Sequence, residues 1–336
     1  MSKITRRTTT TGLFPLPDEA KETLKEQKGR QKDDLIDGSE GGEINASYAD
    51  ARRTVIGWQN DVGLDRIVEG QVRWDDMLAH PLAVHENVKT GGLRRYYDNN
   101  NFYREVTIEG PLTPDGDIAR DLEAASEHVP ADRLQAIIPG PISLTDLASD
   151  EYYGGEEALL EGITSFLREE IAAYPSVETV LLLEPSITST RLSVPSDTAI
   201  DAISEVVNSS ATAGIDEIIV HTYWGALDAG TYRGLLDIDR LGVGFDFVTA
   251  RDASLSLIED YGAPPLTGLG VVDAHNTRVE SPDAISSEVE TVSSISSEIE
   301  RVFLSFNAEG FYLPTNRFRE KLDVLARACH GVEVDA

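Results

Sequence analysis

The 336-residue chain contains little sulfur and little positive charge: Cys329 is its single cysteine, and Lys89 and Lys321 are its only lysines beyond Lys32. One cysteine excludes an internal disulfide and a multi-cysteine metal site, so core packing is the expected role of Cys329. No stretch approaches the roughly 20 apolar residues that cross a bilayer, and the N-terminal MSKITRRTTTTGLF lacks the apolar core of a secretory signal. These absences predict a soluble, cytoplasmic protein with no membrane partner.

Acidic residues greatly outnumber basic ones, with 59 Asp and Glu against 29 Lys and Arg and a formal net charge of −30. Such a charge repels nucleic-acid phosphates, so a nucleic-acid partner is not expected. The spread of acidic residues along helical segments suggests an acidic, halophilic proteome, because salt screens the self-repulsion. An ordinary acidic cytosolic protein is the alternative.

Several common catalytic and nucleotide-binding motifs are absent, including the Walker sequence, the HExxH pair and the Gly-x-Ser-x-Gly elbow. Gly242-Val243-Gly244 and Gly268-Leu269-Gly270 lie in apolar strand segments and do not open a helix. They therefore lack the strand–turn–helix context of a dinucleotide fingerprint.

Short apolar segments, each ending in a polar residue, alternate with helix-patterned segments along most of the chain. Unbroken apolar runs of four to eight residues are typical of strands buried on both faces of a parallel sheet. The pattern predicts a single (β/α)8 TIM barrel over residues 1–336. The clearest strand segments are Gln135–Pro141, Thr179–Pro185, Glu217–Tyr223, Gly242–Thr249, Leu269–His275 and Val302–Glu309.

Other segments complete or decorate this barrel. We expect the first two strands at Thr8–Phe14 and Ile67–Gln71, and a small insertion near residues 96–115, where Phe102–Thr113 can form a hairpin. Ser281-Pro282 predicts a helix start, since a capping hydroxyl precedes proline at the first helical position. Glu19–Gln31 and Glu43–Val62 predict an N-terminal helical extension.

Polar side chains at the ends of the expected strands mark the candidate active site, because the carboxyl ends of barrel strands meet at one rim. These residues are Glu184, His221, Asp246, Asp273, His275 and Glu309. Imidazole and carboxylate groups from different strands could bind Zn²⁺ or Mn²⁺. Alternatively, they hydrogen-bond loops and cap helices, and the lack of a His-x-His or Glu-x-x-His pair favours this second interpretation.

Seven segments together resemble cobalamin-independent methionine synthases, in particular the short single-barrel archaeal form. GVVDAHNTRVE at Gly270–Glu280 is the most specific of them. The resemblance implies a zinc (β/α)8 barrel that transfers a methyl group to homocysteine from a methyl-folate or, in some archaeal relatives, a methyl-corrinoid donor. The other segments are Thr8–Pro15 (TTTTGLFP), Glu69–Met77 (EGQVRWDDM), Ile138–Leu144 (IPGPISL), Leu183–Pro185 (LEP), His221–Tyr223 (HTY) and Phe306–Phe311 (FNAEGF).

The zinc ligands that the resemblance implies are mostly replaced in this chain. Of the family's histidine, glutamate and two cysteines, only the histidine remains, as His221, while Tyr223, Arg251 and Glu309 occupy the other positions. Arginine cannot donate a lone pair, so a family-type zinc site is doubtful. We predict that Arg251 pairs with Glu309 or Asp246 in place of the metal charge. The resemblance makes His221, Asp246 and Glu309 the candidate catalytic residues.

The resemblance also implies a set of substrate-binding residues. The carboxylates that hold the substrate amino group in the family are replaced by Gln71 and Leu183. Asn276 and Arg278 could bind a pterin or a carboxylate tail, or simply brace their loop. Trp224 could stack on a flat donor or only pack. The complete candidate set is Gln71, Asp76, Glu184, Asp273, Asn276, Arg278 and Trp224.

Three hypotheses follow for a protein whose partner is a small-molecule substrate. The first is a homocysteine methyltransferase with an altered or metal-free site. The second is a catalytically degenerate donor-binding subunit that works with a zinc-containing homologue, since the large family members carry a second, metal-free barrel. The third is a uroporphyrinogen-decarboxylase-like barrel, although the expected arginine clamp is not evident.

Overall fold

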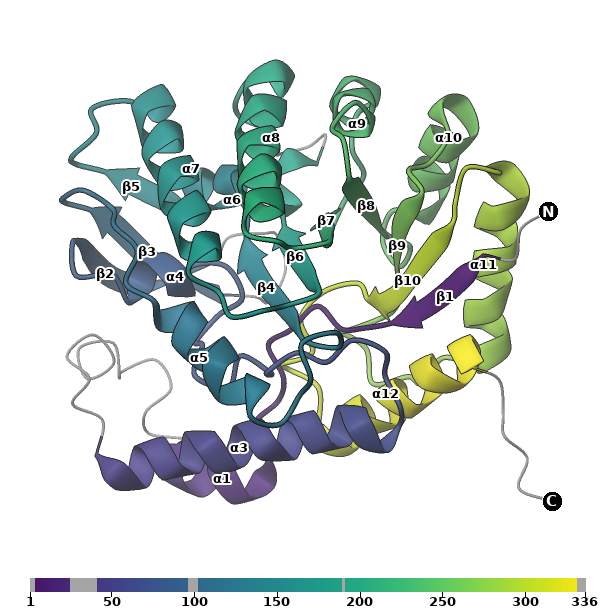
Figure 1. The fold of residues 1–336 in the computed structure, drawn as a ribbon, viewed down its shortest axis with the longest axis horizontal. Helices are drawn as coiled ribbons and strands as arrows, with labels where there is room; N and C mark the ends of the chain where they lie inside the picture. Colours follow the sequence, from purple (N-terminus) through teal and green to yellow (C-terminus); the bar gives the residue numbers. More distant parts are fainter. Residues whose placement is uncertain (1–3, 25–40, 96–101, 189–190, 331–336) are drawn as a thin grey trace.

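The computed structural model describes residues 4–24, 41–95, 102–188 and 191–330. In these residues a curled parallel sheet of seven strands has the order β1-β10-β9-β8-β7-β6-β4 (Figure 1). The strands after β1 are buried almost throughout, as the unbroken apolar runs predict. Their bounds are Thr5–Thr8 (β1), Gln135–Pro139 (β4), Thr179–Leu183 (β6), Glu217–His221 (β7), Leu241–Asp246 (β8), Leu266–Val272 (β9) and Arg301–Phe306 (β10).

The sheet closes between its two outer strands through the segment around Ile67. Ile67 forms a parallel bridge with Leu134, next to β4. On the other side, the backbone N–H of Arg66 donates a 3.0 Å hydrogen bond to the carbonyl of Thr8 in β1. This segment therefore takes the eighth strand position, and the expected TIM barrel is confirmed.

The bounds expected for the first two strands were wrong: the first strand lies earlier in the chain, and the second is shorter. The first is Thr5–Thr8 and ends where Thr8–Phe14 was expected to begin, and the residues after it form a loop in which Leu13 has a positive φ of 42°. The second is reduced to the single bridge at Ile67, because Gly70 (φ 94°) and Gln71 (φ 48°) adopt left-handed conformations that no strand accommodates.

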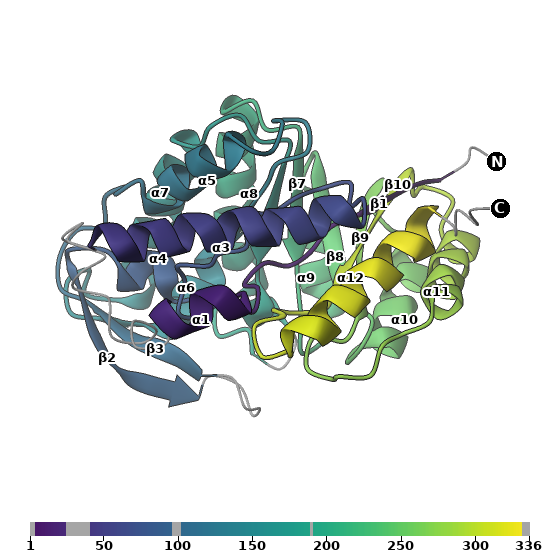
Figure 2. The same ribbon diagram turned by 90° about the horizontal axis from the view of Figure 1, so that it is seen from below.

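Helices surround the sheet, and α3 and α12 lie side by side along one flank with α1 packed on α3 (Figure 2). The N-terminal extension is confirmed as α1 and α3, although residues 25–31 of its first expected helix lie outside the described residues. The cap of α11 is also confirmed, since Ser281 Oγ accepts from the N–H of Ala284. The helices are α1 (Asp18–Leu24), α3 (Gly42–Asp61), α4 (His80–Ala83), α5 (Asp117–Ser126), α6 (Pro141–Leu147), α7 (Glu156–Ala172), α8 (Ser196–Thr212), α9 (Ala229–Leu236), α10 (Arg251–Tyr261), α11 (Pro282–Ile295) and α12 (Thr315–His330).

The insertion is a hairpin that begins earlier than expected. Strands β2 (Val88–Arg95) and β3 (Phe102–Ile108) pair antiparallel, and the short β5 (Ala148–Asp150) adds to β3. Expected bounds near 96–115 missed β2, because its sequence VKTGGLRR is polar and contains two glycines, which are depleted in strands. Residues 96–101 lie outside the described residues.

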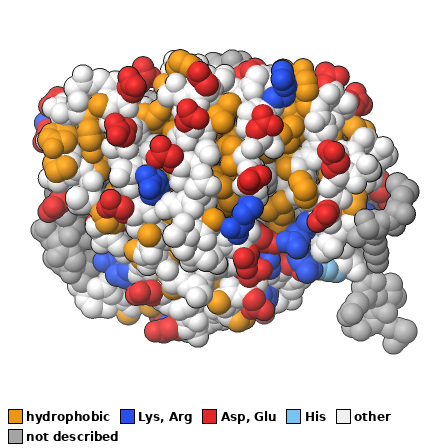
Figure 3. Space-filling view, turned by 45° about the horizontal axis from the view of Figure 1, so that its top comes forward, with side chains coloured by type: hydrophobic (Ala, Val, Ile, Leu, Met, Phe, Trp, Pro, Cys, Tyr) orange, Lys and Arg blue, Asp and Glu red, His pale blue; other side chains and the backbone are white. Residues whose placement is uncertain are grey.

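On the face drawn in Figure 3, Asp and Glu side chains lie scattered among neutral and apolar ones. This distribution fits the expectation that the acidic residues solubilise the helices. Among the described residues, no helix combines the length and apolar character needed to cross a membrane.

Candidate functional site

His221 ends β7 on the inner side of the barrel rim, the edge where the parallel strands end. Its Nε2 lies 2.9 Å from the carbonyl oxygen of Asn307, so this nitrogen carries the proton and donates. Its Nδ1 lies against Gly244 of β8, where a Cβ would approach to 2.5 Å, so the absence of a side chain there makes room for the ring. Burial lowers the pKa of His221 despite the opposing effects of the Asn307 carbonyl and Asp246, and the ring stays neutral.

Asp246 ends β8 beside His221, and its hydrogen bonds hold the loops that follow β7 and β8. Its carboxylate accepts hydrogen bonds from the backbone N–H groups of Trp224, Val248 and Thr249 and from the Thr249 hydroxyl, at 2.6–2.9 Å. The side-chain amide of Asn307 donates to both of its oxygens at 3.3 Å. Asp246 therefore has its acceptor capacity used by protein donors.

Glu309 and His275 form a pair at the rim, and one carboxylate oxygen of Glu309 has no hydrogen-bond partner among the described residues. Glu309 is 2 % exposed, and its Oε1 lies 3.9 Å from Nε2 of His275. Its Oε2 is buried and has no hydrogen-bond partner among the described residues. The ring of Trp224 lies 5.6 Å from that of His275, centroid to centroid. Burial lowers the pKa of His275, but the hydrogen bond and charge of Glu309, with Asp273 and Asp246, raise it overall.

Gln71 and Glu184 are both buried, and the backbone N–H of Glu184 donates to the carbonyl of His221 at 2.9 Å. Gln71 accepts from the N–H of Leu13 at 2.8 Å, while its Nε2 is buried without a partner among the described residues. Glu184 accepts from Ser143 Oγ at 2.6 Å and from the N–H groups of Ile142 and Ser143 at 2.9 Å. Burial raises the pKa of Glu184 to about 7, although these hydrogen bonds oppose the shift. Glu184 thus caps α6, and Gln71 keeps a free donor.

Asp76 ties the segment after the Ile67 bridge to the hairpin. Its carboxylate accepts from the N–H groups of Leu78, Ala79 and Arg104 at 2.5–3.1 Å. Burial raises its pKa to about 6 against the effect of those hydrogen bonds. Asp76 is therefore held by protein donors, and its contacts orient the hairpin.

The loop from Asp273 to Glu280 carries Asn276 and Arg278 at the surface. Asn276 Oδ1 accepts from the N–H of Arg278, and Asp273 Oδ1 accepts from the N–H of His275. These local hydrogen bonds support the interpretation that the motif braces its own loop, while the exposed ends of both side chains remain accessible to a ligand.

The prediction that Arg251 replaces the metal charge is wrong. Arg251 is the first residue of α10, and its guanidinium pairs with Glu288 of α11 at 2.9 Å and with Asp252. It lies five residues beyond the rim of β8, because the strand ends at Asp246 and a turn follows. The carboxylate at the rim end of this strand is that of Asp246.

The rim residues do not fit a zinc ion of the family type. His221 offers neither nitrogen, since Nε2 donates to a carbonyl and Nδ1 faces the backbone of Gly244. Asp246 is saturated by donors, and neither Tyr223 nor Glu309 offers the soft thiolate that favours zinc. In the described parts of the chain, the rim residues do not form a group of three ligand atoms within 4.8 Å; the one such group, Asp65, Cys329 and His330, lies elsewhere.

The fold and the rim define a (β/α)8 barrel with a buried imidazole–carboxylate site. Residues 7–307 match the family model "Cobalamin-independent synthase, Catalytic domain". The chain therefore belongs to the cobalamin-independent methionine synthase family, as the resemblance implied. Membership supports a methyltransferase of methionine biosynthesis, decides against a uroporphyrinogen-decarboxylase-like protein and gives no support to a corrinoid donor.

Individual relatives agree with this assignment. The methionine synthase of Saccharolobus islandicus is 22% identical over 282 residues, which cover 83% of this chain and 80% of that protein. The methionine synthase of Sulfolobus acidocaldarius is 20% identical over 283 residues, covering 83% and 78% of the two chains.

Two solved structures share the fold. A B12-independent methionine synthase from Shewanella, in complex with selenomethionine, superposes with a TM-score of 0.71 at 17% identity and covers 97% of both chains. A B12-independent methionine synthase structure from Listeria monocytogenes gives 0.70 at 19% identity and covers 98% of both chains.

Asn307 is a central site residue that sequence reasoning missed. Its carbonyl accepts from His221, its Oδ1 accepts from the N–H of Ala274, and its amide donates to Asp246. The residue thus connects β7, β8 and β9 at the rim. Its position directly after the apolar end of β10, inside the segment FNAEGF, was the available signal.

Proposed function

We propose that this chain transfers a methyl group from a methylfolate to the thiol of homocysteine, in methionine biosynthesis, at a rim site without family-type zinc. His221, Asp246 and Glu309 form the core of this site. The observation that carries the proposal is the buried Glu309, whose Oε2 has no partner among the described residues while Oε1 faces His275. A buried, unpaired carboxylate oxygen is costly unless a ligand supplies the donor.

The chemistry requires an ionised thiol, because the thiolate is the nucleophile. The thiol proton goes to Glu309, the sulfur attacks the methyl carbon, and the bond between that carbon and the folate nitrogen breaks. The electron pair stays on the nitrogen, which takes up a proton from water, and Glu309 returns its proton to water after the transfer. Glu309 raises the pKa of His275, and the imidazolium form of His275 would stabilise the thiolate. His221 and Asp246 do not transfer protons in this scheme: through Asn307 they hold the rim loops in place.

The other candidate residues act in substrate binding. Gln71 Nε2 is a buried donor without a partner among the described residues, so it suits an acceptor such as a carboxylate oxygen. Trp224 offers a ring face next to His275 for the flat donor. The exposed Asn276 and Arg278 are placed to reach a pterin or a carboxylate tail, while Asp76, Glu184 and Asp273 position the loops.

The test is methyl transfer to homocysteine in high salt, with protein treated with a chelator. We expect turnover to survive chelation, to drop by at least a hundredfold in Glu309→Gln and to remain near wild type in Glu288→Gln, a matched change in the partner of Arg251. Full activity in Glu309→Gln would refute the role of this carboxylate.

The poor fit of the rim to zinc favours a second candidate, a donor-binding subunit that works with a zinc-containing homologue. In this case the chain alone binds methylfolate but transfers nothing until the homologue is added. Assays with each protein alone and with the mixture separate the two candidates. Turnover by this chain alone excludes the subunit role, whereas turnover only by the mixture excludes the metal-free enzyme.

A further inference from the structure

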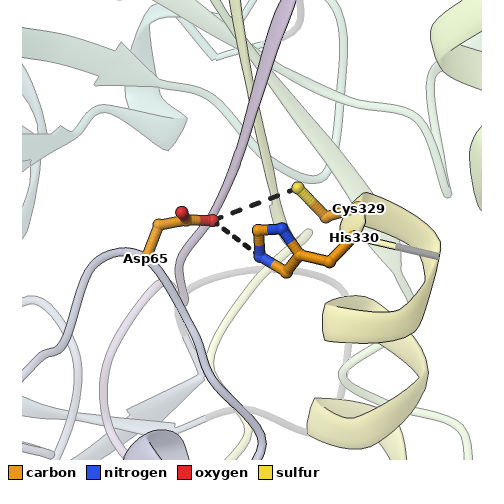
Figure 4. A group of neighbouring side chains, drawn as sticks. All are labelled: Asp65, Cys329 and His330. Atoms are coloured by element: carbon orange, nitrogen blue, oxygen red, sulfur yellow. Dashed lines mark hydrogen bonds and ion pairs between the residues drawn. The ribbon is translucent and has the colours of Figure 1, made fainter. Parts of the chain in front are cut away.

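A second cluster of potential ligand atoms lies at the opposite end of the barrel from the rim. Asp65 Oδ2 is 3.1 Å from His330 Nε2 and 4.0 Å from Cys329 Sγ (Figure 4). All three ligand atoms lie within 4.8 Å of one another. Asp65 precedes the Ile67 bridge, and Cys329 and His330 end α12, so residues far apart in the chain converge here.

The Asp65 carboxylate is held in place by partners other than the cysteine and the histidine. The backbone N–H and the hydroxyl of Thr8 both donate to Oδ2 at 2.9 Å, and Arg7 Nη1 lies 3.3 Å from Oδ1. The N–H of Asp65 donates back to the Thr8 hydroxyl at 3.0 Å. Outer hydrogen bonds of this kind fix the orientation of metal-binding carboxylates.

We propose that Asp65, Cys329 and His330 bind a divalent metal of intermediate softness, such as Zn²⁺. Thiolate, imidazole and carboxylate are all zinc ligands, and bond lengths of about 2.0–2.3 Å at tetrahedral angles separate ligand atoms by about 3.3–3.6 Å. The separations of 3.1 and 4.0 Å from Asp65 require shifts of a few tenths of an ångström, and the ligand atoms of Cys329 and His330, within 4.8 Å of each other, have to move together. In the metal-bound form, coordination by Nε2 replaces its contact with Asp65.

The surroundings of the cluster leave room for a fourth metal ligand, and the protein ligands can balance the charge of the ion. A cavity of about 730 Å³, lined by Asp65 and His330 among others, opens beside the cluster, so water can complete the coordination. A carboxylate and a thiolate neutralise the two charges of the ion. In the free protein, burial and the nearby Asp65 raise the pKa of the Cys329 thiol to about 12, and a bound metal would reverse this by stabilising the thiolate.

Such a site would link the end of α12 to Asp65, which is itself hydrogen-bonded to Thr8 of β1. Helix α12 already packs against β1, and Arg6 Nη1 of β1 lies 3.5 Å from the carbonyl of Ala328. A metal bound between Asp65 and the end of α12 would add to this contact at the amino-terminal end of the barrel, the end that contributes to stability while the opposite rim carries the active site. Its role is therefore structural, and it is independent of the methyl-transfer proposal.

The test uses the full chain, freed of metal by chelation, and titrates it with Co²⁺ and Zn²⁺ alone. We expect one Co²⁺ per chain with a thiolate-to-cobalt charge-transfer band, Zn²⁺ that displaces it, and a Tm that rises with Zn²⁺ concentration. Zn²⁺ should also slow modification of Cys329 by a thiol reagent at least tenfold. Cys329→Ser should remove the band, and His330→Gln should weaken binding by 10-fold or more.

Matched variants separate this site from the rim and from the surface. His128→Gln, at an exposed histidine, and Glu309→Gln, at the rim, should leave the band and the Tm shift unchanged. The proposal is overturned if Co²⁺ gives no thiolate band, if metal binding persists in Cys329→Ser/His330→Gln, or if binding disappears in Glu309→Gln. Circular dichroism confirms that each variant is folded before titration.

Discussion

Nε2 of His275 lies 3.9 Å from Oε1 of Glu309, and the two residues come from the loops that follow β9 and β10. The carboxylate is buried while the imidazole is about one-third exposed. This pairing raises the pKa of His275 even though burial acts in the opposite direction. The contact with Glu309 therefore favours the imidazolium form of His275.

Replacing Glu309 by glutamine should lower the pKa of His275, because the main partner that favours the imidazolium is lost. A pKa raised in the folded state stabilises the protein fully below the unfolded value of about 6.5, and this contribution is lost as pH rises through the folded pKa. Glu309→Gln should therefore cost more stability near pH 6 than near pH 9. Proton NMR titration of the His275 ring and urea unfolding at both pH values measure these effects, with Glu288→Gln as the unchanged control.

Lys321 of α12 should be essential for the loop that carries His275. It is fully buried, and its Nζ lies 2.9 Å from both oxygens of Glu280 and donates to the carbonyl of Arg278. Lys321→Met leaves a partly buried carboxylate without its cation and should lower the free energy of unfolding by about 3–5 kcal/mol. The double variant Lys321→Met/Glu280→Gln should recover part of this loss. Equal losses in the single and double variants, measured by urea unfolding, would contradict the pairing.

Gly140 should not tolerate a side chain. A Cβ at this position would lie 2.1 Å from Glu184 Oε1 and 2.3 Å from its Cδ, so the carboxylate that caps α6 would have to move. Gly140→Ala should therefore lower the free energy of unfolding by about 2 kcal/mol or more. Gly57→Ala, inside α3 with open space around the new methyl group, should be neutral or stabilising by up to about 1 kcal/mol. Thermal unfolding of the two variants compares them directly.

High salt should stabilise this protein. A formal charge of −30 produces self-repulsion in the folded state, and the Debye length shortens from about 10 Å at 0.1 M to about 3 Å at 1 M salt. We expect Tm to rise by several degrees between 0.1 and 2 M KCl. High salt also strengthens apolar burial. The rise in Tm between 0.1 and 2 M KCl should therefore be measured as well for a variant with ten surface Glu→Gln changes. An equal response of the two proteins would show that charge screening is not the cause.

The sequence alone determined the barrel class and most of its parallel strands. Apolar runs such as Thr179–Leu183 and Glu217–His221 are buried on both faces, and that local signal needs no tertiary information. It also predicted that His221 and Asp246 end strands at one rim, which they do, since strand ends of a parallel barrel coincide, whereas Glu309 lies in the loop that follows β10. The segments TTTTGLFP and GVVDAHNTRVE indicated the family to which the chain belongs.

Only the tertiary structure decided how these residues are paired. Arg251 binds Glu288 because α10 and α11 pack together, and Asn307 connects His221 to Asp246 because neighbouring strands place them within hydrogen-bond distance. The polar hairpin strand β2 likewise exists because β3 pairs with it. Periodicity along a chain reports which face of an element is buried, whereas the choice of partner depends on atoms that are distant in sequence.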